Sequence, residues 1–501
     1  MRIFHLSDTH VGSASDFNKG TLYRLLEAIN ESGCDLVIHS GDVTQGGRRT
    51  EYKRARQMLS RIEAPAVILP GNHDARSGGL HLFEEYIGDT SGVREIGDTA
   101  VIWVNSAFAD SDQGRVGMVK YNMMRRALNE HSDTSIKIIA LHHHVVPIPR
   151  AGRERNVLYN AGDILDLILS SDVDLVLSGH RHYPNIYRIE NTVFINAGAA
   201  SATKTRYGDV NSYNLVDIDA ERQHVATRWV DGSQREQTFS RRRRHVFSDF
   251  GRRVFRAVQV SNSYISDGRA FLPQHFRNAV DAISGLQPDL LVHCGGIVRE
   301  GIPQDYDIAA RELSRFNVPV IYTPAGRDIN YLGYHLYATH FGQFDQAYSD
   351  GAILFQGISS AQYDSHEGIV GPTERRAVLD QLAAAPEHIK AVFLHHNVLP
   401  IPHSREKGLL EDAGDLLREL VDANVDLILT GTSSHPFAAR VGNTVVINAN
   451  SLSSVYQRSL YGNSFNLIDI YEGAIAVFEI NSLWGRRRLL GIWERNNQSS
   501  D

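Results

Sequence analysis

The chain has 501 residues, which is more than one hydrophobic core usually accommodates, so we expect two or three domains. Its hydrophobic content of 42% and charged content of 22% are those of an ordinary globular protein. A net charge of −7 and a pI of about 6.4 argue against a protein that coats nucleic acid by bulk electrostatics.

Cysteine content and hydropathy indicate the compartment. Cys34 and Cys294 are the only cysteines, which excludes a disulfide framework and is typical of a reducing environment. No apolar run approaches the length needed to cross a bilayer, so we expect no membrane partner. The first predicted strand begins at about Arg2, which leaves no room for a leader segment. We therefore expect a cytoplasmic protein.

From the N-terminus onward, short apolar runs alternate with segments that have helical character. The first predicted strand is "RIFHLS" at 2–7, the first predicted helix is "TLYRLLEAINES" at 21–32, and the next strand is "DLVIHSG" at 35–41. Runs such as "KIIALH" at 137–142 and "DLVLSG" at 174–179 continue the pattern. This alternation predicts an α/β fold with largely buried strands.

Polar side chains directly follow five of these apolar runs. They are Asp8 and His10, Asp42, Asn72 and His73, the cluster His142 to His144, and His180 and His182. A single Asp or His at a strand end is more often a cap or turn residue than a ligand, and Gly71-Asn72 alone is typical of a tight turn. Five such sites in one region instead indicate a shared functional site, because the carboxyl ends of strands in α/β folds carry functional loops.

The residue types in this set indicate a metal centre. Aspartate oxygens, imidazole nitrogens and one amide oxygen, without a thiolate, suit ions such as Mn, Fe or Zn. The set is too large for one catalytic metal that keeps an open position, but it suits two ions about 3.5–4 Å apart that share a bridging carboxylate. Such a pair polarises a phosphoryl oxygen and generates a hydroxide near neutral pH. The expected cofactor is therefore two divalent or trivalent metal ions.

The first half ends in an arginine-rich stretch, "SRRRRHVFSDFGRR" at 240–253. A second arginine run, "WGRRRLL" at 484–490, lies near the end of the second half. We therefore interpret the first stretch as a solvated linker or terminal strand. A patch that contacts an anion or a nucleic acid is the alternative.

The second half repeats the first. "APAVILPGNHD" at 64–74 recurs as "VPVIYTPAGRD" at 318–328, and "IALHHHVVPIPR" at 139–150 recurs as "VFLHHNVLPIPH" at 392–403. The repeated blocks keep their order at a nearly constant offset, which indicates a duplicated large domain rather than a solenoid. We predict a catalytic domain at 1–240, an Arg-rich linker at 241–253 and a degenerate domain at 254–501.

The second copy lacks most of the candidate metal ligands. Position by position, the replacements are Asp8 by Asn262, His10 by Tyr264, Asp42 by Gly296, Asn72 by Gly326, His73 by Arg327, His180 by Thr432 and His182 by Ser434. His396, which aligns with His143, is retained. Without a bridging carboxylate, two like-charged ions could not be held close together. The remaining histidines, among them His293, His395 and His435, do not have the spacing of another ligand set.

The motifs "DTH…GDVTQGG…GNHDAR…LHHH…GHRH" of the first half resemble those of the calcineurin-like metallophosphoesterase superfamily, which read D-x-H, G-D, G-N-H-D/E, H and G-H-x-H. The stretch at 40–76 is most similar to bacterial class III cyclic-nucleotide phosphodiesterases and their glycerophosphodiesterase relatives. The resemblance implies a four-layer αββα sandwich with metals at the strand ends. For the whole chain it implies two such sandwich domains in tandem, the second a pseudoenzyme.

The resemblance also implies a role for each residue that matches the motifs. Asp8, His10 and His182 would hold the first metal, Asn72, His143 and His180 the second, and Asp42 would bridge them. His73 would lie beside the phosphate and stabilise or protonate the leaving oxygen, with Asp74 orienting it. The family usually has His-x-Pro at the fourth motif, and Val145 replaces that proline. Counting back from Val145 makes His143 the ligand, with His142 or His144 as a neighbour.

The expected function is a metal-dependent phosphodiesterase, active only in the first domain, that cleaves a small or nucleotide diester through a metal-bridging hydroxide. A DNA or RNA nuclease of the same superfamily is the first alternative, although the negative net charge does not favour it. A non-catalytic scaffold or sensor is the second. The second domain would serve as a pseudo-dimer partner, as a cap over the cleft, or as a surface for an anion or a protein.

Overall fold

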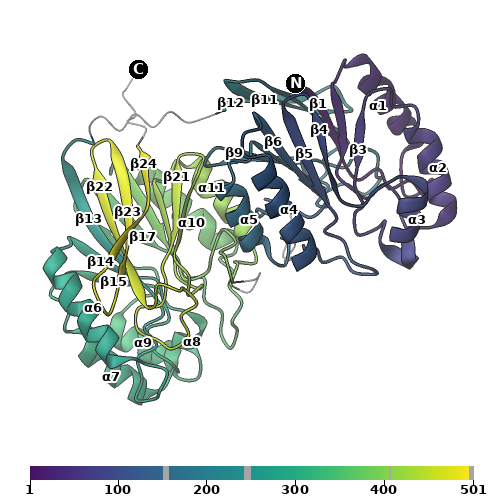
Figure 1. The fold of residues 1–501 in the computed structure, drawn as a ribbon. Helices are drawn as coiled ribbons and strands as arrows, with labels where there is room; N and C mark the ends of the chain where they lie inside the picture. The colour runs from purple at the N-terminus through teal and green to yellow at the C-terminus, as the bar shows by residue number, and fades with distance from the viewer. Residues whose placement is uncertain (151–156, 242–249, 405–407, 496–501) are drawn as a thin grey trace. The chain divides into compact units, whose positions relative to one another are not determined.

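A computed structural model describes residues 1–150, 157–241, 250–404 and 408–495 (Figure 1). The chain divides into two compact units, Met1–Arg244 and His245–Asp501, which we call the N-terminal and the C-terminal unit. Both are α/β with mixed sheets. Within the described ranges, no helix has the length and apolar character needed to traverse a lipid bilayer.

The N-terminal unit contains two six-stranded sheets and the helices that cover them. The strands are β1 (Arg2–Leu6), β2 (Leu36–His39), β3 (Ala66–Ile68), β4 (Gly92–Ile96), β5 (Thr99–Val104), β6 (Ile136–Leu141), β7 (Leu175–Ser178), β8 (Asn185–Ile189), β9 (Thr192–Asn196), β10 (Ser212–Ile218), β11 (Arg222–Trp229) and β12 (Gln234–Ser240). The helices are α1 (Lys19–Glu31), α2 (Arg49–Leu59), the short 3-10 helix η1 (Arg76–Gly78), α3 (Gly79–Tyr86), α4 (Met118–Glu130) and α5 (Ala161–Ser170).

Strand order places the parallel strands of each sheet side by side. The first sheet runs β12-β11-β10-β1-β2-β3, and β1, β2 and β3 are parallel. The second runs β8-β9-β7-β6-β5-β4, and β5, β6, β7 and β9 are parallel. The carboxyl ends of β1, β2 and β3 therefore lie at one edge of the first sheet, and those of β6 and β7 at one edge of the second.

The side-chain alternation of β1 and β2 builds two cores on opposite faces of the first sheet. Ile3, Leu36 and Ile38 pack between the two sheets against residues of β5, β6 and β7. Phe4 and Val37 point the other way, toward α1 and α2. Alternate residues of a strand face opposite sides of its sheet, so a sheet buried on both faces reads as a continuous apolar run. Helices α4 and α5 cover the second sheet (Figure 1), which completes the expected αββα layers in this unit.

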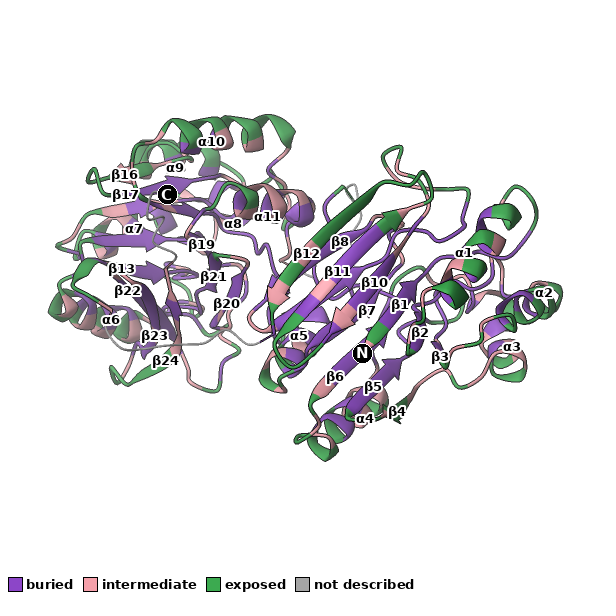
Figure 2. Cartoon of the chain, turned by 90° about the horizontal axis from the view of Figure 1, so that it is seen from above, coloured by how far each residue is buried: buried purple, intermediate pink, exposed green. Residues whose placement is uncertain are grey.

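Helix α1 illustrates how the sequence forms a covering helix. The side chain of Asn18 accepts a hydrogen bond from the backbone N–H of Thr21 at 3.0 Å and caps the helix. Leu22, Leu25, Leu26 and Ile29 are buried on one face, at the spacing of an amphipathic helix. Figure 2 shows the result, with buried strands at the centre of each unit and exposed outer faces on α1 and α2.

The C-terminal unit repeats this strand order. Its strands are β13 (Arg253–Val260), β14 (Leu290–His293), β15 (Val320–Tyr322), β16 (Ala347–Ser349), β17 (Ile353–Gly357), β18 (Ile389–Phe393), β19 (Leu427–Thr430), β20 (Phe437–Val441), β21 (Thr444–Asn448), β22 (Ser464–Tyr471), β23 (Ala474–Asn481) and β24 (Arg487–Glu494). Its helices are α6 (Pro273–Leu286), α7 (Pro303–Leu313), α8 (Gly326–Ile329), α9 (Gly333–Phe341), α10 (Pro372–Ala384) and α11 (Ala413–Asp422). One sheet runs β15-β14-β13-β22-β23-β24, and the other runs β16-β17-β18-β19-β21-β20.

The predicted linker at 241–253 falls largely at 242–249, outside the described residues. At its two ends the chain is part of the fold. Arg241 is buried, and its Nε donates to Asp174 Oδ1 at 2.8 Å. Arg253 is the first residue of β13. Arg241 therefore forms a buried ion pair, which differs from the solvated linker predicted for this position.

Candidate metal centre

The loops after five strands of the N-terminal unit bring the candidate residues together. Asp8 and His10 follow β1, Asp42 follows β2, Asn72 and His73 follow β3, the histidine cluster follows β6, and His180 and His182 follow β7. The backbone turns sharply at many of these positions. Asp8, His10, Asp42, His180 and His182 have positive φ values between 48° and 75°. This left-handed conformation is uncommon for residues other than glycine and clusters at functional sites.

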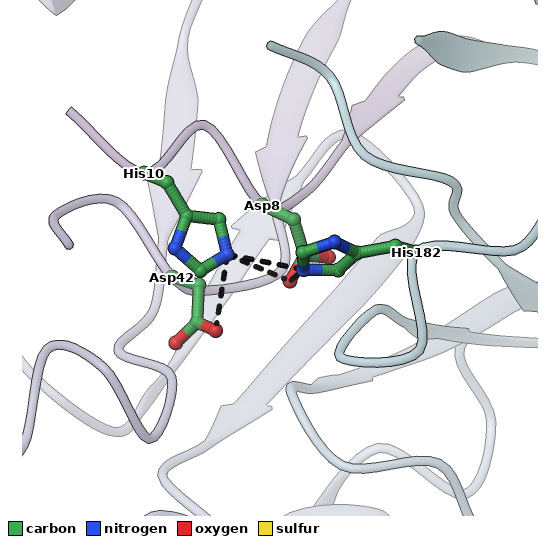
Figure 3. A group of neighbouring side chains, drawn as sticks. All are labelled: Asp8, His10, Asp42 and His182. Carbon is green, nitrogen blue, oxygen red and sulfur yellow. Dashed lines mark hydrogen bonds and ion pairs between the residues drawn. The ribbon is translucent and has the colours of Figure 1, made fainter. Parts of the chain in front are cut away.

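The first group of donors comprises Asp8, His10, Asp42 and His182 (Figure 3). One donor atom from each lies within 4.8 Å of the others. The Nε2 atoms of His10 and His182 are 3.1 Å apart, and His182 Nε2 is 3.2 Å from Asp8 Oδ1. Asp8 Oδ1 is buried and accepts no hydrogen bond from the described residues. Two imidazole nitrogens and two carboxylates that converge on one point fit a divalent cation such as Mn, Fe or Zn.

The second group surrounds the side chain of Asn72. Its Oδ1 lies 3.0 Å from His142 Nε2 and 3.0 Å from His180 Nδ1. Asp42 adjoins both groups, because its Oδ2 is 3.5 Å from His10 Nε2 and 3.4 Å from His142 Nε2. A carboxylate in this position can bridge two neighbouring ions.

The structure places the adjacent histidines of the cluster in different surroundings. His142, and not the predicted His143, lies against Asn72 and Asp42. The Nδ1 of His142 is 2.8 Å from the carbonyl oxygen of Ser40, so Nδ1–H donates there and Nε2 faces Asn72 and Asp42. The ring of His143 turns away, with Nδ1 2.8 Å from Ser106 Oγ. Consecutive residues that leave a strand point to opposite sides, so the two rings face different groups, and the metal-ligand role predicted from Val145 stays a prediction.

Asp74 also differs from the prediction that it orients His73. Asp74 is buried and accepts hydrogen bonds from the backbone N–H groups of Val43 (2.9 Å), Thr44 (2.8 Å) and Gly71 (2.9 Å). It therefore ties the loop after β2 to the loop after β3. The Nδ1 of His73 instead lies 2.8 Å from the carbonyl oxygen of Gln45. Asp74 positions the backbone that carries the donors rather than the imidazole.

Electrostatics at the centre favours bound positive charge. Burial alone would raise the pKa of Asp42, but His142, His73 and His10 outweigh it and lower the pKa well below its usual range. Burial likewise opposes ionisation of Asp8, and His182 and His10 lower its pKa. The same attraction raises the pKa of His142 to about 9, against the effect of burial, because Asp42 and Asp8 are close. Two buried, ionised carboxylates require compensating cations.

The centre opens into a cavity of about 600 Å³. His73 lines this cavity next to His10, with ring centroids 4.5 Å apart. The lining also includes the cationic side chains of Arg76, Lys204 and Arg206. His73 is thus placed where it can give a proton to a group beside the metal centre, and the cations favour an anionic ligand.

Sequence reasoning missed two residues beside Asn72 and His73, as well as Lys204 and Arg206 of the cavity lining. Arg76 and Asp112 contact His73 and Asn72 from the η1 segment and from the loop after β5. Asp112 belongs to none of the five motifs and lies 40 positions from Asn72. The only signal for either residue was that Arg76 is the last residue of "GNHDAR".

Fold and donor set together define a metallophosphoesterase, and comparison with known proteins agrees. Residues 1–184 match the family of calcineurin-like phosphoesterases. This N-terminal part of the chain is a calcineurin-like metallophosphoesterase, and it makes the protein a phosphoesterase enzyme.

Several relatives are phosphodiesterases. A probable cyclic nucleotide phosphodiesterase of Coxiella burnetii is 26% identical over 206 residues, which is 40% of this chain and 83% of that protein. A 3',5'-cyclic adenosine monophosphate phosphodiesterase, CpdA, of Escherichia coli K12 is 26% identical over 36% of this chain and 70% of its own length. A glycerophosphodiester phosphodiesterase, GpdQ, of Enterobacter lignolyticus is 26% identical over 36% of this chain and 71% of its own length.

Similar solved structures include a purple acid phosphatase from yellow lupin, with a TM-score of 0.40, 16% identity and coverage of 48% of this chain and 54% of the other. A dimetal phosphatase from Danio rerio has a TM-score of 0.40 and 11% identity, over 48% of this chain and 99% of the other.

Proposed function

We propose that the N-terminal unit is a dinuclear-metal phosphodiesterase that hydrolyses a small or nucleotide phosphodiester. The observation that carries the proposal is the position of Asp42, whose Oδ2 lies 3.5 Å from a nitrogen of the first donor group and 3.4 Å from one of the second. One ion would be held by Asp8, His10 and His182, a second by Asn72, His142 and His180, and Asp42 would contact both. The donor types suit Mn, Fe or Zn.

The bound ions would supply Lewis acidity at the phosphoryl group and an acidified water molecule. The protein's own side chains would transfer the proton, bind the substrate and align the donors. His73 faces the cavity beside His10 and donates a proton to the leaving oxygen. Lys204 and Arg206 bind the negative charge of the diester. The hydrogen bonds of His142 to Ser40 and of Asp74 to the loop backbone keep the donors aligned.

Small diesters are the proposed substrates for two reasons. The relatives with substrate names act on cyclic nucleotides or glycerophosphodiesters. In addition, the cavity of about 600 Å³ suits a single small ligand.

We further propose that the C-terminal unit is a degenerate, non-catalytic copy with the same αββα layers. Its two sheets have the strand orders of the N-terminal sheets, and its loops carry Asn262, Tyr264 and Gly296 where the first copy has Asp8, His10 and Asp42. The C-terminal unit would serve as a packing or protein-interaction surface. We also propose that the protein is cytoplasmic. Cys34 and Cys294 are both free, in keeping with a reducing compartment.

The experiment is a substrate panel on metal-reconstituted protein. Protein loaded with Mn, Fe or Zn is tested on bis-p-nitrophenyl phosphate, cyclic nucleotides, glycerophosphodiesters and single-stranded DNA. We expect turnover of one or more small diesters and loss of turnover in Asp42→Asn. Asn262→Ala, at the position matching Asp8, serves as the control and keeps full activity. Undiminished activity in Asp42→Asn would refute the proposal, and turnover of DNA alone would replace it with a nuclease.

A further inference from the structure

An exposed carboxylate at the mouth of the centre connects the amide of Asn72 with His73. The Oδ1 of Asp112 accepts a hydrogen bond from Asn72 Nδ2 at 2.8 Å and another from Arg76 Nη2 at 2.9 Å. The Nη1 of the same Arg76 lies 3.0 Å from His73 Nδ1. A continuous chain of contacts therefore runs from Asn72 through Asp112 and Arg76 to His73.

We propose that Asp112 and Arg76 are positioning residues: Asp112 fixes Asn72 with its oxygen toward the second metal position, and Arg76 fixes the ring of His73. The inference rests on the proposed dinuclear function of this site. It adds two residues to which the motifs assign no role and gives each a separate task.

The chemistry of the amide explains the task of Asp112. An Asn side chain can present either its oxygen or its NH₂ group to a neighbour, and only the oxygen can bind a cation. An ionised carboxylate accepts hydrogen bonds and donates none. When Asn72 Nδ2 donates to Asp112, the oxygen must therefore point the opposite way. It does so, lying 3.0 Å from both His142 Nε2 and His180 Nδ1.

The guanidinium of Arg76 is suited to span the gap to His73. Its planar fork offers separate N–H groups in a rigid arrangement, so one nitrogen contacts Asp112 while the other contacts the imidazole. The carbonyl of Gln45 contacts the same His73 Nδ1 at 2.8 Å. Nδ1 serves one of these partners at a time: as Nδ1–H it donates to Gln45, and as a bare nitrogen it accepts from Arg76. In the tautomer that accepts from Arg76, Nε2 carries the proton.

The C-terminal unit shows that the loop does not need these side chains for its own shape. The carbonyl oxygen of Asp112 lies 3.3 Å from His143 Nε2, and that of the aligned His366 lies 3.3 Å from His396 Nε2. The backbone thus follows the same course in both units. The connected side chains nevertheless all differ: Asn72 is replaced by Gly326, His73 by Arg327, Arg76 by Asn330 and Asp112 by His366.

Neighbours that only support the loop are retained. Ser111 Oγ accepts a hydrogen bond from the N–H of Gln113 at 3.2 Å, and its counterpart Ser365 accepts one from Glu367 at 2.9 Å. The side chain of Asp112 is 73% exposed. An exposed ion pair adds little to stability. A stabilising role therefore accounts poorly for Asp112, whereas orienting a metal ligand accounts for its contacts.

Metal binding to the full-length protein tests the role of Asp112 without reference to turnover. Metal-free protein is titrated with Mn²⁺ by calorimetry, and the wild type is expected to bind two ions. Asp112→Ala should bind the first ion as the wild type does and the second about 10–100-fold more weakly, the usual cost of removing a group that orients a ligand. Ser111→Ala, a structural change in the same loop, should bind both ions normally.

Equal affinity of Asp112→Ala and wild type for the second ion would overturn the inference while leaving the proposed function intact. The same holds if Ser111→Ala weakens the second ion as much as Asp112→Ala does. A wild-type protein that binds no second ion would overturn both the inference and the proposed function.

The role of Arg76 is tested by turnover. Arg76→Ala should keep both ions and lower kcat about tenfold with KM nearly unchanged. An unchanged kcat would remove Arg76 from the assignment.

Discussion

The two units of this chain share a framework and differ in the side chains that it presents. In the N-terminal unit, His142 Nδ1 lies 2.8 Å from the carbonyl of Ser40; in the C-terminal unit, His395 Nδ1 lies 2.7 Å from that of Cys294. His143 and His396 likewise contact a serine Oγ, at 2.8 and 2.9 Å. The contacts recur atom by atom. Both histidines therefore serve the framework, and their retention in the second copy does not depend on catalysis.

The buried aspartates Asp74 and Asp328 also serve the framework in both units. Asp328 accepts hydrogen bonds from the backbone N–H groups of Gly296, Val298 and Ala325 at 2.8–2.9 Å, as Asp74 does in the first copy. Burial raises the pKa of both carboxyls to about 6. The aspartate is retained as Asp328 although the residue before it is Arg327 instead of a histidine. The aspartate at this position therefore holds the loop and does not depend on the histidine.

What changes between the units is the charge at the centre. Asn262 and Tyr264 keep the left-handed backbone of Asp8 and His10, with φ of 50° and 47°, so the strained turn persists without the donors. The guanidinium of Arg327 lies over the ring of Tyr264, 6.0 Å from its centroid. The first copy gathers the carboxylates Asp8 and Asp42 at this centre. The second has neither carboxylate and carries a cation, Arg327, where the first has His73.

The largest expected effect separates the two units by activity. Asp8→Asn removes a charged donor of the first group and should lower kcat/KM on the order of a thousandfold, as loss of a key electrostatic group does. Asn262→Ala should change kcat/KM less than about twofold, because the second copy has no donor set there. Steady-state rates with a small diester measure kcat/KM for both variants. Comparable losses in the two variants would break the contrast between the units.

The second prediction concerns matched ion pairs. Arg241 and Asp174 are both buried, with 2.8 Å between Nε and Oδ1, whereas the aligned Arg495 and Asp426 are 3.6 Å apart and more exposed. Arg241→Ala removes a buried cationic partner of Asp174 and should lower the free energy of unfolding by about 3 kcal/mol. Arg495→Ala should cost about 1 kcal/mol or less. Denaturant titrations of both variants measure the difference, and equal costs would contradict it.

A third prediction uses the two adjacent histidines. His142→Ala should weaken binding of the second metal ion and lower activity about a hundredfold, because the ring adjoins both Asn72 and Asp42. His395→Ala, its counterpart, should leave activity unchanged. Calorimetry with Mn²⁺ and rate measurements test both variants. Full metal binding by His142→Ala would return the assignment to His143.

The smallest expected effect is a pH dependence. The pKa of Asp328 is raised by burial from 3.8 to about 6 in the folded protein, so the folded state holds a proton that the unfolded state releases. The protonated carboxyl of Asp328 contributes fully to stability below about pH 4, and this contribution is lost as the pH rises through about 6. The loss is on the order of 1–3 kcal/mol. Thermal unfolding of the full chain between pH 4 and 7 should show a weaker pH dependence in Asp328→Asn than in the wild type.

Much of the site was predictable because the donors sit at strand ends within short motifs. The order of the motifs predicted a calcineurin-like phosphoesterase, which the family match over residues 1–184 confirms. The structure brings Asp8, His10, Asp42 and His182 together, as the motifs predicted, and their role as metal ligands stays a prediction. The repeat also distinguishes the apolar strands, which both copies contain, from most of the donors, which only the first copy contains.

The contacts that the sequence did not predict share one cause. The choice between His142 and His143 depends on which way a side chain leaves the strand end, and the motif spacing does not specify that rotation. The role of Asp74 depends on three backbone N–H groups from two loops. Asp112 reaches Asn72 across 40 positions, a contact that no local pattern encodes.

The sequence by itself determined the α/β class, the duplication and the set of donors, because apolar periodicity and residue chemistry are local properties of the chain. Tertiary structure alone decided which histidine faces Asn72, what Asp74 holds, and that Asp112 and Arg76 join the site. Those outcomes depend on backbone turns and on packing between distant loops, and these are set only when the strands align and their carboxyl ends meet.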